Sequence, residues 1–147
     1  MASTFVNNLR VAEPADGDAD WGTSTNTSLE LIGEALGVGT EGITTNADTH
    51  TSTVADGATD PARALHLQYT GTLDSACTIT IAPNTLKRVQ IIENATSGGQ
   101  SIIIKQGSGA TITILNGTKR IVYLDGAGSG AAVVDITAAA FGAQAFY

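Results

Sequence analysis

Three aspartates at alternate positions form the pattern in this chain that most resembles a metal site. Asp16, Asp18 and Asp20 stand in the stretch ADGDADWGTSTN, which starts as a calcium-binding EF-hand loop starts. Such a loop also needs glycine at its sixth position and glutamate at its twelfth. Counted from Asp16, those positions hold Trp21 and Thr27. The pattern therefore favours a solvated acidic turn before a helix, where the helix dipole stabilises negative charge, and we expect no metal and no cofactor.

Histidines and carboxylates are the other side chains that could carry chemistry. His50 and His66 are the only histidines, and neither has a cysteine or carboxylate at a metal-ligand spacing. An ion shared by histidines on a trimer axis stays an alternative. Asp74, Glu93 and Asp125 could meet as an acid/base pair, although no pattern requires it. Motifs for hydrolase nucleophiles, zinc proteases and phosphate loops do not occur, so we expect no catalytic residues and no enzyme.

One short helix is predicted before the main run of strands. Thr27 is followed three residues later by Glu30, a capping box, and the pattern predicts a helix over about residues 27–36. Its apolar face holds Leu29, Ile32 and Leu36, widened by Leu31 and Ala35. A helix this short needs to dock that face on something. The polar, threonine-rich residues up to 63 indicate an extended segment, so residues 1–63 are expected to form an N-terminal arm.

Strand patterns dominate the chain after residue 63. In CTITI, apolar Cys77, Ile79 and Ile81 alternate with threonine, which is typical of a half-buried antiparallel strand. Asn116-Gly117 is a tight-hairpin signal between two such runs. The predicted fold is mainly β, with a single antiparallel sandwich or barrel-like domain over residues 64–136. An extended arm with one short helix precedes this domain, and an apolar tail over residues 137–147 follows it.

The composition limits the possible partners. Seven basic and 14 acidic residues give a net charge of −7, which repels nucleic acid and anionic lipid. No stretch is long and apolar enough to predict membrane insertion, and Cys77 alone cannot form an internal disulfide. Aromatic residues make up only 5% of the chain, and several strands are apolar on both faces. A second sheet or another subunit is therefore expected to cover those faces.

A few large apolar residues outside the strands are candidates for attachment. Trp21 is the single tryptophan, and it is expected either to pack locally or to anchor an adjoining subunit. The uncharged tail is expected to lie on its own domain or on a neighbour. The candidate attachment or interface residues are Trp21, Leu29, Ile32, Leu36, Phe141, Phe146 and Tyr147.

Several segments carry a resemblance to a known class of proteins. They are WGTSTNTSLELIGEALG with the threonine-rich run after it, IIENATSGGQSIIIKQGSGATITI, and VYLDGAGSGAAVVD. From about Asn8 to Asp135 the chain resembles a module of accessory structural proteins of tailed bacteriophages, especially marine ones. Those proteins are fibre-like and usually homotrimeric. The resemblance implies a homotrimer on the virion surface, assembled in the bacterial cytoplasm, with tail or capsid proteins as further partners and no catalytic residues.

Three functions follow as expectations. The first is a tail-associated fibre or spike component that supports host adsorption. The alternative is a capsid decoration, a cement or head-fibre protein that stabilises the head, because the chain stops after the module without a large receptor-binding tip. The further alternative is a carbohydrate-binding module with a host surface glycan as partner. It would need exposed aromatic platforms, for which the sequence offers Tyr69, Tyr123 and the terminal aromatics.

Overall fold

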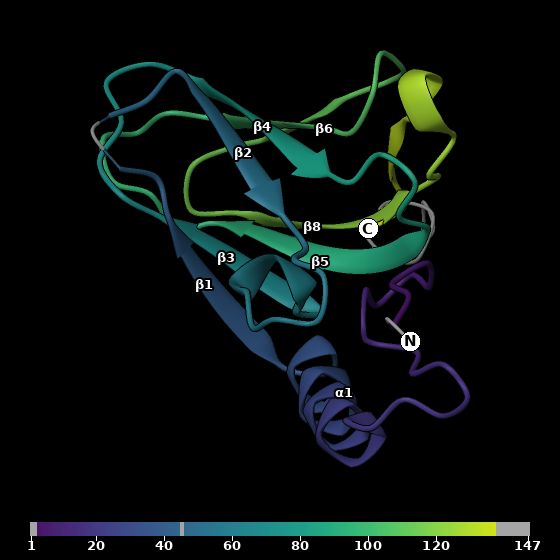
Figure 1. Ribbon diagram of the computed structural model, residues 1–147. Helices are drawn as coiled ribbons and strands as arrows, with labels where there is room; N and C mark the ends of the chain where they lie inside the picture. The colour runs from purple at the N-terminus through teal and green to yellow at the C-terminus, as the bar shows by residue number, and fades with distance from the viewer. Residues whose placement is uncertain (1–2, 45, 138–147) are drawn as a thin grey trace.

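The protein is described here by a computed structural model that covers residues 3–44 and 46–137. It contains two mixed β-sheets and one α-helix near the N-terminus (Figure 1). In chain order the elements are α1 (Trp21–Ala35), β1 (Val38–Gly42), β2 (Thr49–Thr53), the 3-10 turn η1 (Pro61–Arg63), β3 (His66–Thr70), β4 (Cys77–Ala82), β5 (Arg88–Asn94), β6 (Ile102–Lys105), β7 (Ile112–Ile114), β8 (Lys119–Leu124), the 3-10 turn η2 (Gly128–Gly130) and β9 (Val133–Asp135). The prediction of a mainly β, sandwich-like domain is confirmed.

The first six strands alternate between the two sheets and build a short coil. One sheet has the order β1-β3-β5-β8-β9 and the other β2-β4-β6-β7. Within each sheet the first three strands pair in parallel, so each turn of the coil adds one strand to both sheets. His66 pairs with Ile91 and Cys77 with Ile102, and a parallel bridge joins Thr72 to Ser97 between them. The second and third turns therefore stack along their whole length.

Antiparallel strands close the coil at its last turn. β8 pairs with β5, β9 with β8, and β7 with β6. The predicted antiparallel domain is thus corrected to mixed sheets. The error has a physical cause: alternation with a period of two reports which face of a strand is buried, and it is the same for a parallel neighbour as for an antiparallel one.

Two strands lie inside the segment that was expected to form the arm. β1 pairs with β3 and β2 pairs with β4, so both belong to the sandwich, and the sheets begin well before residue 64. Their sequences, VGTEG and THTST, show weak alternation because β1 and β2 are edge strands with much of their surface in solvent. The expected boundary at residue 63 therefore does not separate arm from sheet.

Two local signals in the sequence have a different role in the structure. The helix begins at Trp21 rather than near Thr27, with Asp20 at its N-cap, so Thr27 lies inside the helix and forms no capping box. The residues around Asn116-Gly117 do turn, and the Thr118 N–H donates to the Leu115 carbonyl at 3.1 Å. That turn joins β7 to β8, which belong to different sheets, so it is a crossover and not a hairpin.

The core lies between the two sheets within one chain. Cys77, Ile79 and Ile81 are buried as predicted, and Leu67 and Tyr69 face them from the other sheet. Burial also raises the pKa of the Cys77 thiol. Because each sheet covers the inner face of the other, no second subunit is needed to fill this core.

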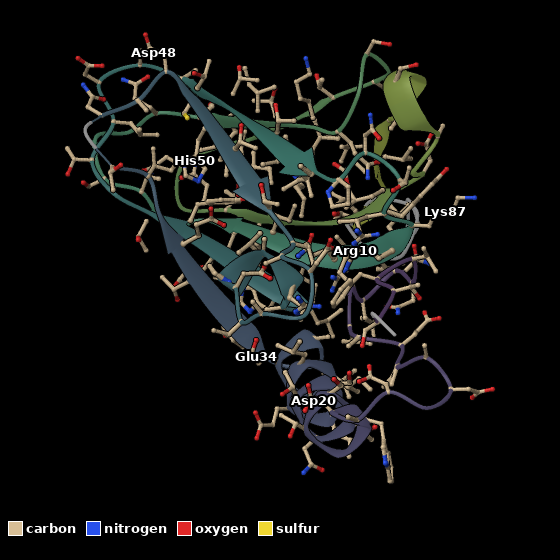
Figure 2. The ribbon with its side chains drawn as sticks, in the orientation of Figure 1. Arg10, Asp20, Glu34, Asp48, His50 and Lys87 are labelled. Carbon is tan, nitrogen blue, oxygen red and sulfur yellow. The ribbon has the colours of Figure 1, made fainter. Side chains whose placement is uncertain are left out.

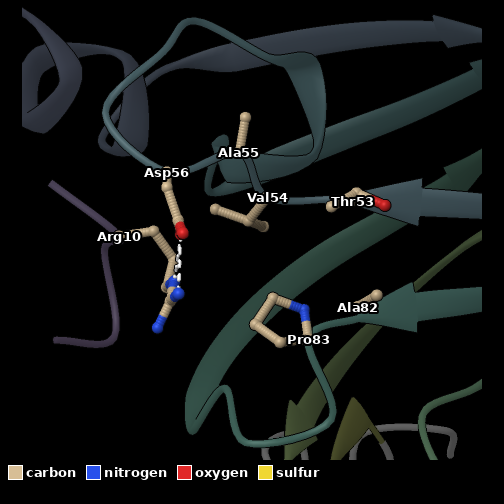
Figure 3. A pocket seen from close by; sticks show the side chains of 7 residues that line it. All are labelled: Arg10, Thr53, Val54, Ala55, Asp56, Ala82 and Pro83. Atoms are coloured by element: carbon tan, nitrogen blue, oxygen red, sulfur yellow. Dashed lines mark hydrogen bonds and ion pairs between the residues drawn. The ribbon is translucent and has the colours of Figure 1, made fainter. Parts of the chain in front are cut away.

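The described part of the arm packs on its own chain. The Gly57 N–H donates to the Arg10 carbonyl at 2.8 Å, and the Lys87 N–H donates to Asn8 Oδ1 at 3.0 Å. The Arg10 guanidinium also binds the Asp56 carboxylate at 2.7 Å beside a hollow of about 290 Å³ (Figure 3). These contacts order the arm without a neighbouring subunit. Residues 138–147, with Phe141, Phe146 and Tyr147, lie outside the described residues.

Candidate attachment surface

The helix α1 projects from one end of the sandwich (Figure 1). Leu31 and Ala35 face the body of the protein and are buried, and the Ser28 hydroxyl donates to the Ala12 carbonyl of the arm at 3.0 Å. The helix ends where the Gly37 N–H donates to the Glu34 carbonyl at 3.1 Å. The side of α1 that carries Ser28, Leu31 and Ala35 is thus fixed to the chain.

Four predicted attachment residues are brought together beside the buried side of α1, three of them on the helix and Leu36 at its C-cap. Trp21, Leu29, Ile32 and Leu36 are 63%, 62%, 36% and 74% exposed, and we call them the apolar stripe. The expectation that Trp21 packs locally is wrong for this chain, since its ring lies mostly in solvent. An apolar stripe on a projecting helix is a surface that is stabilised when another molecule covers it.

The charges near the stripe lie on other sides of the helix. Within α1, all of which is described, the charged residues are Glu30 and Glu34. Glu34 turns back to the sandwich, where its Oε1 accepts a hydrogen bond from the Thr59 hydroxyl at 2.6 Å. The stripe is therefore an uncharged surface on a chain whose net charge is −7.

The acidic turn before α1 is occupied by local hydrogen bonds. Asp18 Oδ1 accepts the Asp20 N–H at 3.0 Å, and Asp18 Oδ2 accepts the Ser3 hydroxyl at 3.4 Å. Asp16, Asp18 and Trp21 line an open hollow of about 420 Å³. Within the described ranges, no group of three or more histidine, cysteine or acidic residues is placed to hold a metal ion.

Both histidines have carboxylate partners that the sequence analysis missed. His50 Nε2 lies 2.7 Å from Glu41 Oε1, which connects β2 to β1, the edge strands of the two sheets. His66 Nε2 lies 2.8 Å from Glu93 Oε2 on neighbouring strands. His66 and Glu93 are 27 residues apart in sequence, and His50 and Glu41 are nine apart on strands of different sheets, so the fold brings both pairs together. The register between β3 and β5 is the signal that could have found the His66–Glu93 pair.

The three carboxylates considered as an acid/base pair have separate surroundings. Glu93 contacts His66, whereas Asp125 Oδ1 accepts the N–H groups of Ala127 and Ala132 at 3.0 and 2.9 Å. Asp74 begins a different turn, where its N–H donates to Asn46 Oδ1 at 2.8 Å. The three residues therefore lie in separate parts of the fold.

The pKa of Glu93 predicts that the stability of the fold depends on pH in the acid range. Burial alone would raise this pKa, but the hydrogen bond with His66 and the charge of Lys119, 3.6 Å away, lower it below its ordinary value. A lowered carboxylate pKa stabilises the fold above the unfolded-state value of about 4.3. That stabilisation is lost as the pH falls through the lower, folded-state pKa.

We therefore expect the Glu93→Gln variant to lose less stability than the native chain between about pH 5 and pH 3. Urea unfolding at a series of pH values measures this difference. Glu30→Gln is the control, because Glu30 is exposed on α1 and its replacement removes the same charge. Parallel curves for Glu93→Gln and the native chain would contradict the expectation.

Comparisons with known proteins add no relative to this picture. No protein-family model, curated protein or solved structure matches the chain. Among the described residues, none of the helices has the length and apolar character needed to span a membrane. Fold and surface together define a mainly β protein with a projecting helix that carries an apolar stripe.

Proposed function

We propose that this chain is a non-enzymatic structural protein on the surface of a tailed-phage particle, where it acts as a homotrimeric, tail-associated fibre or spike component that supports host adsorption. The observation that carries the proposal is the apolar stripe, because a set of large exposed side chains on one side of a projecting helix favours attachment to another protein. The virion setting is supported by the resemblance of the sequence segments to phage accessory proteins.

The architecture supports a structural role in a second way. The two sheets share their core over all three turns of the coil, and the arm is bonded to the loops beside it. The described residues thus form one packed body from which α1 projects. Such an arrangement favours attachment through α1.

The place of the chain on the particle is tested by imaging. Antibodies raised against the purified chain and coupled to gold are applied to intact particles of the phage that carries this sequence, and we expect label at the tail. Antibody absorbed beforehand with the purified chain is the control. Label over the head would instead assign the capsid decoration role. Particles that lack the chain altogether would overturn the proposal of a virion protein.

A carbohydrate-binding function is the second candidate, because one observation favours it. The exposed Trp21 ring stands beside Asp16 and Asp18 at the same open hollow, and an aromatic ring beside carboxylates is suited to a sugar. Tyr69, by contrast, is fully buried and hydrogen-bonded to Ser52 at 2.7 Å, so it cannot serve as a platform. Titration with bacterial surface glycans should quench or shift the fluorescence of the single tryptophan. Unchanged emission at saturating glycan would contradict this function.

A further inference from the structure

The exposed side of α1 has the spacing of a helix-packing seam. Gly22, Thr25, Leu29 and Ile32 on the helix and Leu36 at its C-cap follow one another at intervals of three, four, three and four residues. This is the a and d spacing by which helices pack along a common axis in coiled coils. We call these five positions the seam. Three of them, Leu29, Ile32 and Leu36, belong to the apolar stripe.

The positions that flank the seam carry no charge. On one flank stand Asn26 and Gly33, and on the other Ser28 and Ala35, which are buried against the chain itself. Glu30 lies on the far side of the helix. Two copies of α1 can therefore meet along the seam without bringing like charges together, although each chain carries a net charge of −7.

The choice of residues along the seam indicates how many helices meet. Leucine at a positions with isoleucine at d positions favours three or four helices over two. Here Leu29 and Leu36 take the a positions and Ile32 takes the d position between them. Because α1 projects from the sandwich, with Glu34 near the end where the helix joins the body (Figure 2), neighbouring copies have room to approach it.

We propose that α1 packs in parallel against α1 of two further copies of this chain, with Leu29, Ile32 and Leu36 facing the common axis. This inference rests on the homotrimer of the proposed function and names the surface that forms it. A second copy is the favoured occupant because the seam is self-complementary and free of charge, whereas a coat or tail protein would need to supply a matching stripe. If the test shows that copies of the chain do not meet at the seam, the remaining candidates to cover it are the chain's own tail, residues 138–147, and a different virion protein.

The first experiment compares two double variants of the full chain by sedimentation equilibrium. The native chain should have three times the monomer mass of 14.9 kDa. The double variant Leu29→Gln with Leu36→Gln should raise the dissociation constant of the trimer by at least about a hundredfold. Each buried leucine is expected to lower that constant by roughly a tenfold factor or more. Glutamine keeps the helix propensity, and circular dichroism checks that the variant is folded.

The matched control removes two exposed apolar side chains elsewhere. Val89→Gln with Leu115→Gln changes Val89 on β5 and Leu115 beyond β7, and it should keep the native mass. Three results would overturn the proposal: a native chain that is monomeric at all concentrations, seam variants that keep the native mass, or equal dissociation of both double variants. A monomeric native chain would leave the stripe to the tail or to another virion protein.

A cross-linking experiment tests the parallel arrangement directly. In a parallel bundle, cysteines that replace Leu36 meet at the axis and form disulfide-linked dimers under mild oxidation, whereas the native Cys77 is buried and does not take part. Glu30→Cys, on the far side of α1, is the control and should cross-link at least about tenfold more slowly. Equal rates for the two variants would contradict the parallel seam.

The two proposals fail in different ways. A trimer that is unaffected by the seam variants shows that the seam is wrong, and leaves the virion role intact. A chain that is absent from phage particles but dissociates when the seam is changed shows that the seam is right and the virion role is wrong. The two measurements therefore separate the oligomer surface from the biological setting.

Discussion

Replacing Arg63 by methionine is expected to destabilise the fold by about 3–5 kcal/mol, because it removes one partner of a buried ion pair. Arg63 is fully buried, and one terminal nitrogen of its guanidinium donates to the Ala58 carbonyl at 3.0 Å and to Asp60 Oδ2 at 3.2 Å. Asp60 in turn accepts the N–H groups of Ala55 and Arg63, both at 2.9 Å. Without the guanidinium, the Asp60 carboxylate in the loop between β2 and η1 would stay poorly solvated and would lack its positive partner, which destabilises the folded state.

The Arg10→Met variant provides a matched control for this prediction. Arg10 also binds an aspartate, Asp56, but that carboxylate is half exposed, and exposed pairs contribute only about 0–1 kcal/mol. Urea unfolding of the two variants should therefore give a large loss for Arg63→Met and a small one for Arg10→Met. Small losses of similar size would show that the buried guanidinium does not organise its loop.

The second large effect is expected at a glycine where two turns of the coil stack. Gly98 has a φ of +104°, and a Cβ added there would overlap the carbonyl oxygen of Leu73 in the turn beneath. Strain at positive φ costs about 1–2 kcal/mol, and an overpacked contact adds about 1–3 kcal/mol. Gly98→Ala should thus lower the free energy of unfolding by about 2–5 kcal/mol.

The neighbouring glycine separates these two causes. Gly99 also has a positive φ, +74°, but a Cβ there would meet no other atom within 4 Å. Gly99→Ala should carry the strain alone, about 1–2 kcal/mol. Thermal or urea unfolding of the two variants measures the difference. If both variants lost the same stability, close stacking of the turns at Leu73 would not be the cause.

Much of the sandwich could be predicted from the sequence because alternation reports burial. The pattern in CTITI identified Cys77, Ile79 and Ile81 as inward residues, and all three are buried. It could not give the direction of a neighbouring strand, so the parallel coil was missed. It also could not find β1 and β2, since the side chains of an edge strand are constrained by one neighbour only.

The candidate surface was predicted in part, and the reason lies in the helix. Its sequence places apolar residues on two sides, Leu31 and Ala35 on one and Leu29, Ile32 and Leu36 on the other. Periodicity alone assigns these residues to a single wide apolar face, and it cannot show which part of that face the sandwich covers. In the structure a contact with the arm fixes the orientation of the helix: the Ser28 hydroxyl donates to the Ala12 carbonyl, which holds the side with Leu31 and Ala35 against the chain. Leu29, Ile32 and Leu36 are left in solvent.

The alternation of strands between sheets has a consequence for how the protein is made. None of the strands β1 to β6 pairs with the strand that precedes it, so each of β3 to β6 meets its parallel partner only after the chain has gone once around. Each turn of the coil therefore closes a loop of similar length at a similar entropic cost. The antiparallel strand β8 covers the outer edge of β5 only after the crossover from β7. Until β8 has been synthesised, the outer edge of β5, RVQIIEN, has no partner strand, and an unpaired strand edge is a site at which chains can aggregate.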